Sequence, residues 1–227
     1  MPQSNLVTRL QTLEAAVVAD VMSAMGFTNH VVSPDLTPIA TSHTPTIAGP
    51  AICALGQENA GDLAQATFKL DESVYPGGVV IIATQNCRKG AVIGDNMATS
   101  MKNQGAIGFI TDGGIRDADA FESQEIPIYH SYRSPINAHQ YWSFTQFECP
   151  VTLPGIWDEV CIAPGDLIIA DGDGITVIPD QHAEAIISAA EIHLATENNI
   201  KQCLLEGMDR ETATQQNPRL RHVKPIV

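Results

Sequence analysis

The chain has 227 residues, of which 44% are hydrophobic, and its formal net charge is −14 at pH 7. This length and composition fit one sizeable globular domain with an adequate core. The acidic charge argues against nucleic acid or an anionic membrane as the partner, because binding to either needs a basic surface.

Several common classes of protein are disfavoured by missing motifs. The N-terminal sequence lacks a signal-peptide pattern, and no stretch reaches the ~18 apolar residues of a membrane helix, so we expect a cytoplasmic protein. The five cysteines include no C-x-x-C pair and the seven histidines no H-E-x-x-H pattern, which disfavours disulfides and zinc. G-x-S-x-G, Walker and G-x-G-x-x-G motifs are also missing, which disfavours hydrolases, nucleotide-phosphate binding and Rossmann-type methyltransferases.

The first third of the chain combines apolar residues at helical spacing with unbroken apolar runs. The helical spacing stops at Gly26, a residue that readily ends helices. Sequence rich in Pro, Thr and Ser indicates a loop before the first strand. We predict a helix over 6–25, a loop over 33–50, a strand over 51–55, a helix over 62–70 and a strand over 79–84.

The stretch GDNMATSMKNQGAIGFITDGGIRD, residues 94–117, carries the candidate chemistry. Gly94 and Asp95 indicate a helix start, and Gly105 a stop. An apolar strand over 106–111 follows, and then Asp-Gly-Gly, where the glycines can take backbone angles that other residues avoid. Arg116 and Asp117 therefore emerge at the carboxyl end of a buried strand, where α/β proteins usually place ligands.

These residue types suit a hard cation and a bound 2-oxo acid. An aspartate such as Asp117 is an oxygen ligand for Mg²⁺ or Mn²⁺, and Arg116 beside it supplies a fixed positive fork. Free amides in the first helical turn favour an anion such as a substrate carboxylate. An Arg-Asp pair after a Gly-Gly turn is equally typical of a solvated corner, and the residues alone leave both interpretations open.

The remaining segments are predicted from the same patterns. Polar residues over 85–89 either line the site or form a solvated loop. The aromatic residues over 141–147 are expected to pack in the core rather than stack on bases, since no basic stripe accompanies them. We predict a strand over 126–129, three short strands over 160–179 with a hairpin turn at 171–174, a helix over 181–206 ended by Gly207, and a polar tail over 208–227.

The pattern G-D-x-x-A, G-x-x-G and D-G-G-x-R-D resembles the signature of the RraA-like family, which contains the 4-hydroxy-4-methyl-2-oxoglutarate aldolases. The resemblance covers most of the chain. It implies an α/β fold, a single-domain β/β/α sandwich like the swivelling phosphohistidine domain, over residues 1–207 including the long C-terminal helix. It also implies a homotrimer or homohexamer with active sites between subunits.

The resemblance assigns roles residue by residue. Asp117 matches the protein ligand to the divalent metal, Mg²⁺ or Mn²⁺, and Arg116 the group that contacts the keto or enolate oxygen. Asp95 matches a carboxylate that holds a metal-shell water, and Glu197, with Glu191 as the alternative, matches a glutamate from a neighbouring subunit. The catalytic residues are then Arg116, Asp95 and Glu197, and the substrate-binding residues are Gly94, Asp95, Asn96, Met97 and Arg116.

The resemblance further implies a metal-dependent pyruvate aldolase. Its substrates would be 4-hydroxy-4-methyl-2-oxoglutarate or 4-carboxy-4-hydroxy-2-oxoadipate, cleaved to pyruvate plus pyruvate or oxaloacetate, with oxaloacetate decarboxylation through the same enolate. Asn96 is a departure, because many relatives carry an apolar residue there. The family also contains regulators that bind and inhibit a ribonuclease, and fold-level similarity does not separate the two functions.

Overall fold

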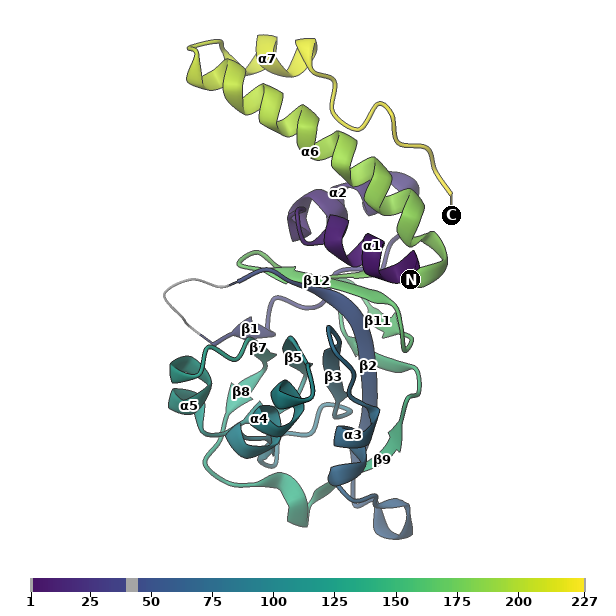
Figure 1. Ribbon diagram of the computed structural model, residues 1–227, viewed down its shortest axis with the longest axis vertical. Coiled ribbons are helices and arrows are strands. Elements are labelled where there is room, and N and C mark those ends of the chain that lie inside the picture. The colour runs from purple at the N-terminus through teal and green to yellow at the C-terminus, as the bar shows by residue number, and fades with distance from the viewer. Residues whose placement is uncertain (1, 40–44, 227) are drawn as a thin grey trace.

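A large mixed sheet organises the computed structural model, which describes residues 2–39 and 45–226 (Figure 1). Within these residues eight strands form the sheet, and β9 (Trp142–Phe147) pairs with the second half of β2. The order of the other seven is β1 (Thr37–Pro38), β7 (Ile128–His130), β5 (Gly108–Thr111), β3 (Val79–Ala83), β2 (Ile47–Glu58), β12 (Leu167–Asp171) and β13 (Gly174–Ile178).

The centre of this sheet is parallel and buried. Strands β2, β3, β5 and β7 run parallel, whereas β12 and β13 form an antiparallel hairpin beside β2. All five residues of β3 are buried, as its unbroken apolar sequence predicts for a strand covered on both faces. The carboxyl ends of β3, β5 and β7 therefore lie at one edge of the sheet.

Each of these three strands continues, after a bend, into a small second sheet. This parallel sheet contains β4 (Ala91–Ile93), β6 (Gly114–Ile115) and β8 (Tyr132–Arg133). A separate hairpin, β10 (Val151–Pro154) and β11 (Glu159–Ile162), packs against the opposite side of the main sheet. The residues of the candidate site follow β4 and β6, at the far ends of two strands of this small sheet.

Helices cover the sheets in two groups (Figure 1). Helices α1 (Pro2–Leu10), α2 (Ala15–Met25) and α6 (Ala183–Leu205) share a core with β12 and β13. Helices α3 (Phe68–Ser73), α4 (Asp95–Asn103) and α5 (Ala118–Ser123) lie beside β3, β5 and the small sheet, where they enclose a second core. The far half of α6 and helix α7 (Arg210–Gln216) extend away from the body.

Several predicted elements have the wrong bounds, and long-range contacts explain why. The predicted helix over 6–25 is two helices, because the chain turns before Ala15, whose amide donates to the carboxylate of Asp171 at 2.8 Å. The predicted helix over 62–70 is wrong. A short 3₁₀ turn and α3 replace it, since the amide of Gln65 donates to the carbonyl of Phe144 on β9 at 2.7 Å.

The loop predicted over 33–50 contains β1 and the start of β2, and its residues 40–44 lie outside the described part of the chain. The strand over 79–84, the hairpin at 171–174 and the long helix ended by Gly207 are confirmed. The tail packs on its own chain, where the amide of Ile226 donates to the carbonyl of Met25 at 2.9 Å. Among the described residues, no helix is both long and apolar enough to cross a membrane.

Candidate active site

The structure brings Arg116 and Asp117 to the amino end of α4. Both residues follow β6, and the backbone amide of Arg116 donates to the carbonyl of Ile93 on β4 at 3.2 Å. The amide of Asp95 donates to Asp117 Oδ2 at 3.3 Å, and Arg116 Nε lies 3.4 Å from the same oxygen. A carboxylate, a guanidinium and a helix N-terminus therefore meet at one corner.

Gly94, the N-cap of α4, is required there for space rather than for backbone freedom. Its φ of −135° is available to any residue. A Cβ atom at this position would lie 2.6 Å from Asp117 Oδ2 and 2.9 Å from Arg116 Nε. The absence of a side chain thus lets both functional groups pack directly against the start of the helix.

Asp117 itself adopts the left-handed conformation, with φ 61° and ψ 39°. Its carbonyl accepts from the amide of Ala120 at 3.0 Å, and α5 begins immediately after it. This conformation is uncommon for residues other than glycine, and aspartate is one of those that tolerate it. The turn directs the carboxylate back toward α4 instead of along α5.

The sequence predicts that the two glycines before this corner take backbone angles that other residues avoid, and this prediction is wrong. Neither Gly113 nor Gly114 has a positive φ. A Cβ at Gly113 would lie 2.6 Å from Thr84 Cγ2, and one at Gly114 would lie 2.5 Å from the ring of Tyr132. The two glycines therefore allow the bends after β3, β5 and β7 to pack closely.

The backbone amides in the first turn of α4, where we expect a substrate carboxylate to bind, already have hydrogen-bond partners in the protein. The amide of Asp95 donates to Asp117, and the amide of Asn96 donates to Asp95 Oδ1 at 2.7 Å. The helix N-terminus thus attracts anions, as expected, but its partners are the protein's own carboxylates.

Asp112 holds the neighbouring bend, a role that the sequence analysis missed. Its carboxylate accepts from the amides of Thr84 at 2.7 Å and Asn86 at 3.1 Å. Gln85 and Asn86 both have positive φ, of 57° and 62°, so this carboxylate stabilises an unusual turn. Burial raises the pKa of Asp112, and the two amide hydrogen bonds oppose that rise.

A cavity of about 370 Å³ opens beside Arg116, and its lining does not include Asp117. This volume is in the range of small-molecule sites. Residues from α3, β4, α4, the 3₁₀ turn Ala138–Gln140 and β9 line it. Of the predicted site residues, the lining includes Gly94, Asn96, Met97 and Arg116.

The corner suits a cation that is held by few protein ligands. The side chain of Asp117 is 38% exposed, and Asp95 adjoins it in the fold. Over the described ranges, no group of three or more His, Cys, Asp or Glu side chains could share a metal ion. Carboxylate oxygens are ligands of the type that Mg²⁺ and Mn²⁺ bind, and these ions commonly keep several waters.

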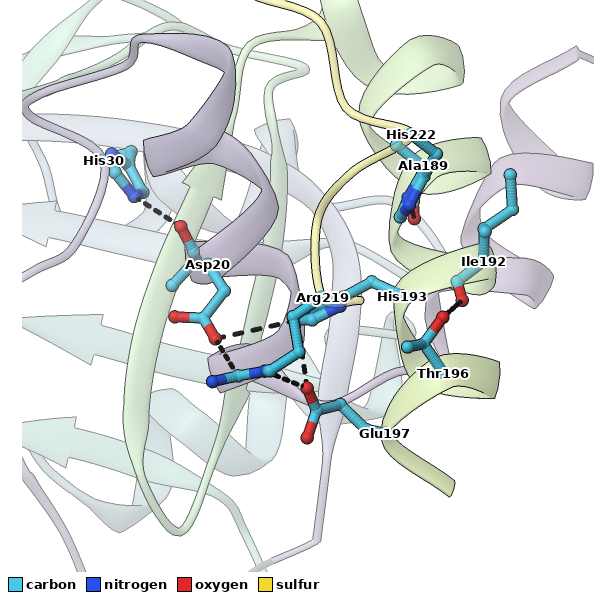
Figure 2. Close-up of polar contacts among 10 residues, drawn as sticks. Asp20, His30, Ala189, Ile192, His193, Thr196, Glu197, Arg219 and His222 are labelled. Carbon is cyan, nitrogen blue, oxygen red and sulfur yellow. Dashed lines mark hydrogen bonds and ion pairs between the residues drawn. The ribbon is translucent and has the colours of Figure 1, made fainter. Parts of the chain in front are cut away.

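Glu197 is not brought to this corner within one chain. It lies on α6, which belongs to one group of helices, whereas α4 belongs to the other (Figure 1). Figure 2 shows its carboxylate paired with Arg219 from the tail, which also donates to Asp20 at 3.0 Å. Glu197 Oε1 lies 3.7 Å from Nε2 of the buried His193.

Glu191, the alternative glutamate, is occupied in a different way. Its two carboxylate oxygens accept from Nε and Nη2 of Arg9, each at 2.8 Å. This bidentate pair joins α1 to α6, and its hydrogen bonds lower the pKa of Glu191. The arrangement favours a structural role for Glu191.

Comparisons with known proteins identify the family of the chain. A "Putative 4-hydroxy-4-methyl-2-oxoglutarate aldolase" of Halalkalibacterium halodurans is 29% identical over 187 residues, 82% of each chain. The crystal structure of Streptomyces coelicolor RraAS2, described as an unusual member of the RNase ES inhibitor RraA protein family, covers 86% of this chain and 94% of that one, with 27% identity and a TM-score of 0.76.

An uncharacterized protein from Pseudomonas syringae pv. tomato superposes over 94% of both chains, with a TM-score of 0.83 and 22% identity, which supports the fold alone. The predicted α/β sandwich is thus confirmed. The family model described as Aldolase/RraA matches residues 15–177. The chain therefore belongs to the RraA-like family.

Proposed function

We propose that the chain is a divalent-metal-dependent carbon–carbon lyase that cleaves a 4-hydroxy-2-oxo acid and releases pyruvate. The observation that carries this proposal is the corner at which Asp117 and Arg116 pack against Gly94, next to a cavity of small-molecule size. The aldolase name of a relative that covers 82% of the chain supports the same class of reaction.

Each residue of the corner has a role in this proposal. Asp117 would hold Mg²⁺ or Mn²⁺, which when bound supplies positive charge toward a keto oxygen. Arg116 donates to the oxygen on which negative charge accumulates. Asn96 and Met97 would offer backbone amides to the substrate carboxylate once the side chain of Asp95 turns away.

The proposed reaction breaks the bond between C3 and C4 of the substrate. A base removes the proton of the C4 hydroxyl, a carbonyl forms at C4, and the electron pair passes to C3 and the keto oxygen as an enolate. A water held by Asp95 then protonates C3, which yields pyruvate. We propose a homotrimer or homohexamer in which Glu197 of a neighbouring subunit completes the site, after this glutamate is released from Arg219.

The two substrates to assay first are 4-hydroxy-4-methyl-2-oxoglutarate and 4-carboxy-4-hydroxy-2-oxoadipate. Cleavage would yield pyruvate plus pyruvate from the former and pyruvate plus oxaloacetate from the latter. Oxaloacetate decarboxylation forms the same enolate by loss of carbon dioxide, so we propose it as a side activity.

Pyruvate release with Mg²⁺ or Mn²⁺, and again with excess EDTA, tests the proposal. We expect activity that EDTA abolishes and added metal restores. Asp117→Ala should lose activity, whereas Asp119→Ala removes an exposed carboxylate two residues away and should retain it. Full activity in EDTA, or an active Asp117→Ala variant, would contradict the metal role.

A second candidate function is supported by the Streptomyces structure, which is described as a member of an RNase inhibitor family. In this alternative the chain binds a ribonuclease and has no turnover of its own. Co-purification with an RNase E-type enzyme, without metal-dependent pyruvate release, would favour this regulator.

A further inference from the structure

Strand β4 gives the cavity beside Arg116 two ends. All three residues of β4 line the cavity, together with Gly94, which follows the strand. The amide of Arg116 donates to the carbonyl of Ile93 at 3.2 Å, so Arg116 lies at the carboxyl end of β4. At about 3.3 Å per residue, the chain from 91 to 94 spans about 10 Å when extended. The lining therefore continues beyond the keto acid end of the proposed substrate.

The segment before β9 lies at the amino end of β4. The amide of Ala91 donates to the carbonyl of Ile136 at 2.8 Å, and Ala91 forms a parallel β-bridge with Asn137. The 3₁₀ turn Ala138–Gln140 follows directly, and both Asn137 and His139 line the cavity. These two residues therefore lie at the end of β4 opposite to the one that contacts Arg116.

Both residues have hydrogen-bond donors to spare. Asn137 Oδ1 accepts from the amide of His139 at 2.8 Å and so caps the 3₁₀ turn, which leaves the two N–H groups of Asn137 Nδ2 for another partner. Over residues 2–39 and 45–226, neither Asn137 Nδ2 nor the ring of His139 has a hydrogen-bond or ion-pair partner. An amide NH₂ group and an imidazole can both donate to a carboxylate.

The charged residues of the lining also favour an anion at each end. Of the described lining residues, Arg116 and His139 are those that can carry a positive charge, and Asp71 on α3 is the one acidic residue. Burial raises the pKa of Asp71, which weakens the repulsion between this carboxyl group and a bound anion. The cavity is thus suited to a ligand with an acidic group at both ends.

We propose that this cavity selects dicarboxylic 2-oxo acids, and that Asn137 Nδ2 and the ring of His139 bind the carboxylate at the far end of the substrate. The inference rests on the proposed function for the orientation of the substrate, with its keto acid end at Arg116. A five-carbon dicarboxylate with a hydrogen bond at each end has a length comparable to that of β4. Within the class of 4-hydroxy-2-oxo acids, a dicarboxylate therefore ranks above its analogue with an uncharged far end.

Binding of two unreactive ligands tests this inference without turnover. 2-Oxoglutarate and 2-oxopentanoate share the keto acid end and a chain of five carbons, and differ in a carboxylate or a methyl group at C5. By isothermal titration calorimetry in the presence of Mg²⁺, we expect 2-oxoglutarate to bind at least about fivefold tighter, because hydrogen bonds to a charged group are the stronger kind. A smaller preference, or no binding of either ligand, would overturn the inference.

A matched pair of variants tests the part played by His139. His139→Ala removes the ring and should reduce the preference to about twofold or less, by weaker 2-oxoglutarate binding with 2-oxopentanoate binding unchanged. Gln140→Ala removes an exposed side chain from the same 3₁₀ turn, outside the lining, and should leave the preference unchanged. An unchanged preference in His139→Ala, or an equal loss in Gln140→Ala, would overturn the role of His139.

A second pair tests Asn137 without loss of the cap. Asn137→Asp keeps an oxygen that can accept from the amide of His139, and replaces the Nδ2 donor by a charged acceptor. We expect this variant to bind 2-oxoglutarate no tighter than 2-oxopentanoate. Gln140→Glu adds the same charge outside the lining and should retain the preference. A preference that persists in Asn137→Asp, or is lost equally in Gln140→Glu, would overturn the role of Asn137.

Turnover then separates this inference from the proposed function. Pyruvate release is compared for 4-hydroxy-4-methyl-2-oxoglutarate and 4-hydroxy-4-methyl-2-oxopentanoate, which differ by a carboxylate in place of a methyl group. His139→Ala should shift the ratio of their kcat/KM values away from the dicarboxylate by about fivefold. Turnover without such a shift overturns the inference and leaves the lyase, whereas the binding preference without turnover overturns the lyase alone.

Discussion

Replacement of Gly94 by alanine tests the geometry of the corner directly. The new Cβ atom would lie 2.6 Å from Asp117 Oδ2 and 2.9 Å from Arg116 Nε. Ordinary contacts between such atoms are about 3.5 Å, so both side chains must move by roughly 1 Å. Because the nearest atoms belong to side chains that are each 38% exposed, and φ at Gly94 is available to any residue, the clash can be relieved by movement of these side chains.

Two different magnitudes follow for Gly94→Ala. A displacement of about 1 Å in groups that position a reacting substrate costs on the order of 100-fold in rate, or about 2.7 kcal/mol in the activation barrier. The free energy of unfolding should change by less than about 1 kcal/mol, since the clash can be relieved at the surface. Activity and stability should therefore separate.

The assay measures kcat/KM for pyruvate release, urea unfolding and the Mg²⁺-dependent rise in melting temperature on the same preparations. Gly172→Ala is the control, because a Cβ there meets no atom within 4 Å. Wild-type activity in Gly94→Ala would refute the argument that Asp117 and Arg116 must pack against position 94. A loss of more than about 3 kcal/mol in unfolding free energy would show that the cost lies in the backbone instead.

Three further predictions concern stability. Arg9→Ala should lower the unfolding free energy by about 0.5–1 kcal/mol at pH 7. Because Arg9 lowers the pKa of Glu191 from its ordinary 4.5, this difference should begin to fade as the pH falls below 4.5, and a difference that is as large at pH 2 as at pH 7 in urea titrations would be inconsistent with the ion pair. Gly56→Ala places a Cβ 2.0 Å from Trp142 Cζ2 in the core, and we expect a loss of about 1–3 kcal/mol by urea unfolding; unchanged stability would contradict that packing. The pKa of Asp112 is raised in the folded protein, so the contribution of this residue to stability falls as the pH rises above its ordinary pKa of 3.8. The stability of Asp112→Asn relative to wild type should therefore improve between pH 3 and pH 7. Thermal melts that give the same difference at both pH values would refute this.

The sequence predicted most reliably those elements whose pattern is local. The apolar run of β3 and the Asp-Gly turn of the β12–β13 hairpin each contain the information that forms them. The predicted helix over 62–70 failed because an amide of this segment pairs with Phe144, about 80 residues later. The break before Ala15 likewise depends on Asp171, and no local pattern indicates it.

The same distinction applies to the candidate site. Gly94, Arg116 and Asp117 lie together as their motif indicated, although their roles remain predictions. Asp112 could have been noticed as a polar residue after a buried strand, but its partners Thr84 and Asn86 follow a different strand. The cavity wall combines α3 with β9, and such a juxtaposition is decided by packing rather than by any one segment.

The left-handed backbone of Asp117 has a consequence for engineering of this protein. Glycine adopts that conformation without the roughly 1 kcal/mol of steric cost that a side chain adds, a gain reduced by the greater freedom of glycine in the unfolded chain. A screen that ranks substitutions by melting temperature would therefore tolerate or even select Asp117→Gly. Thermostable variants chosen in this way should be sequenced at position 117 before any loss of activity is attributed to rigidity.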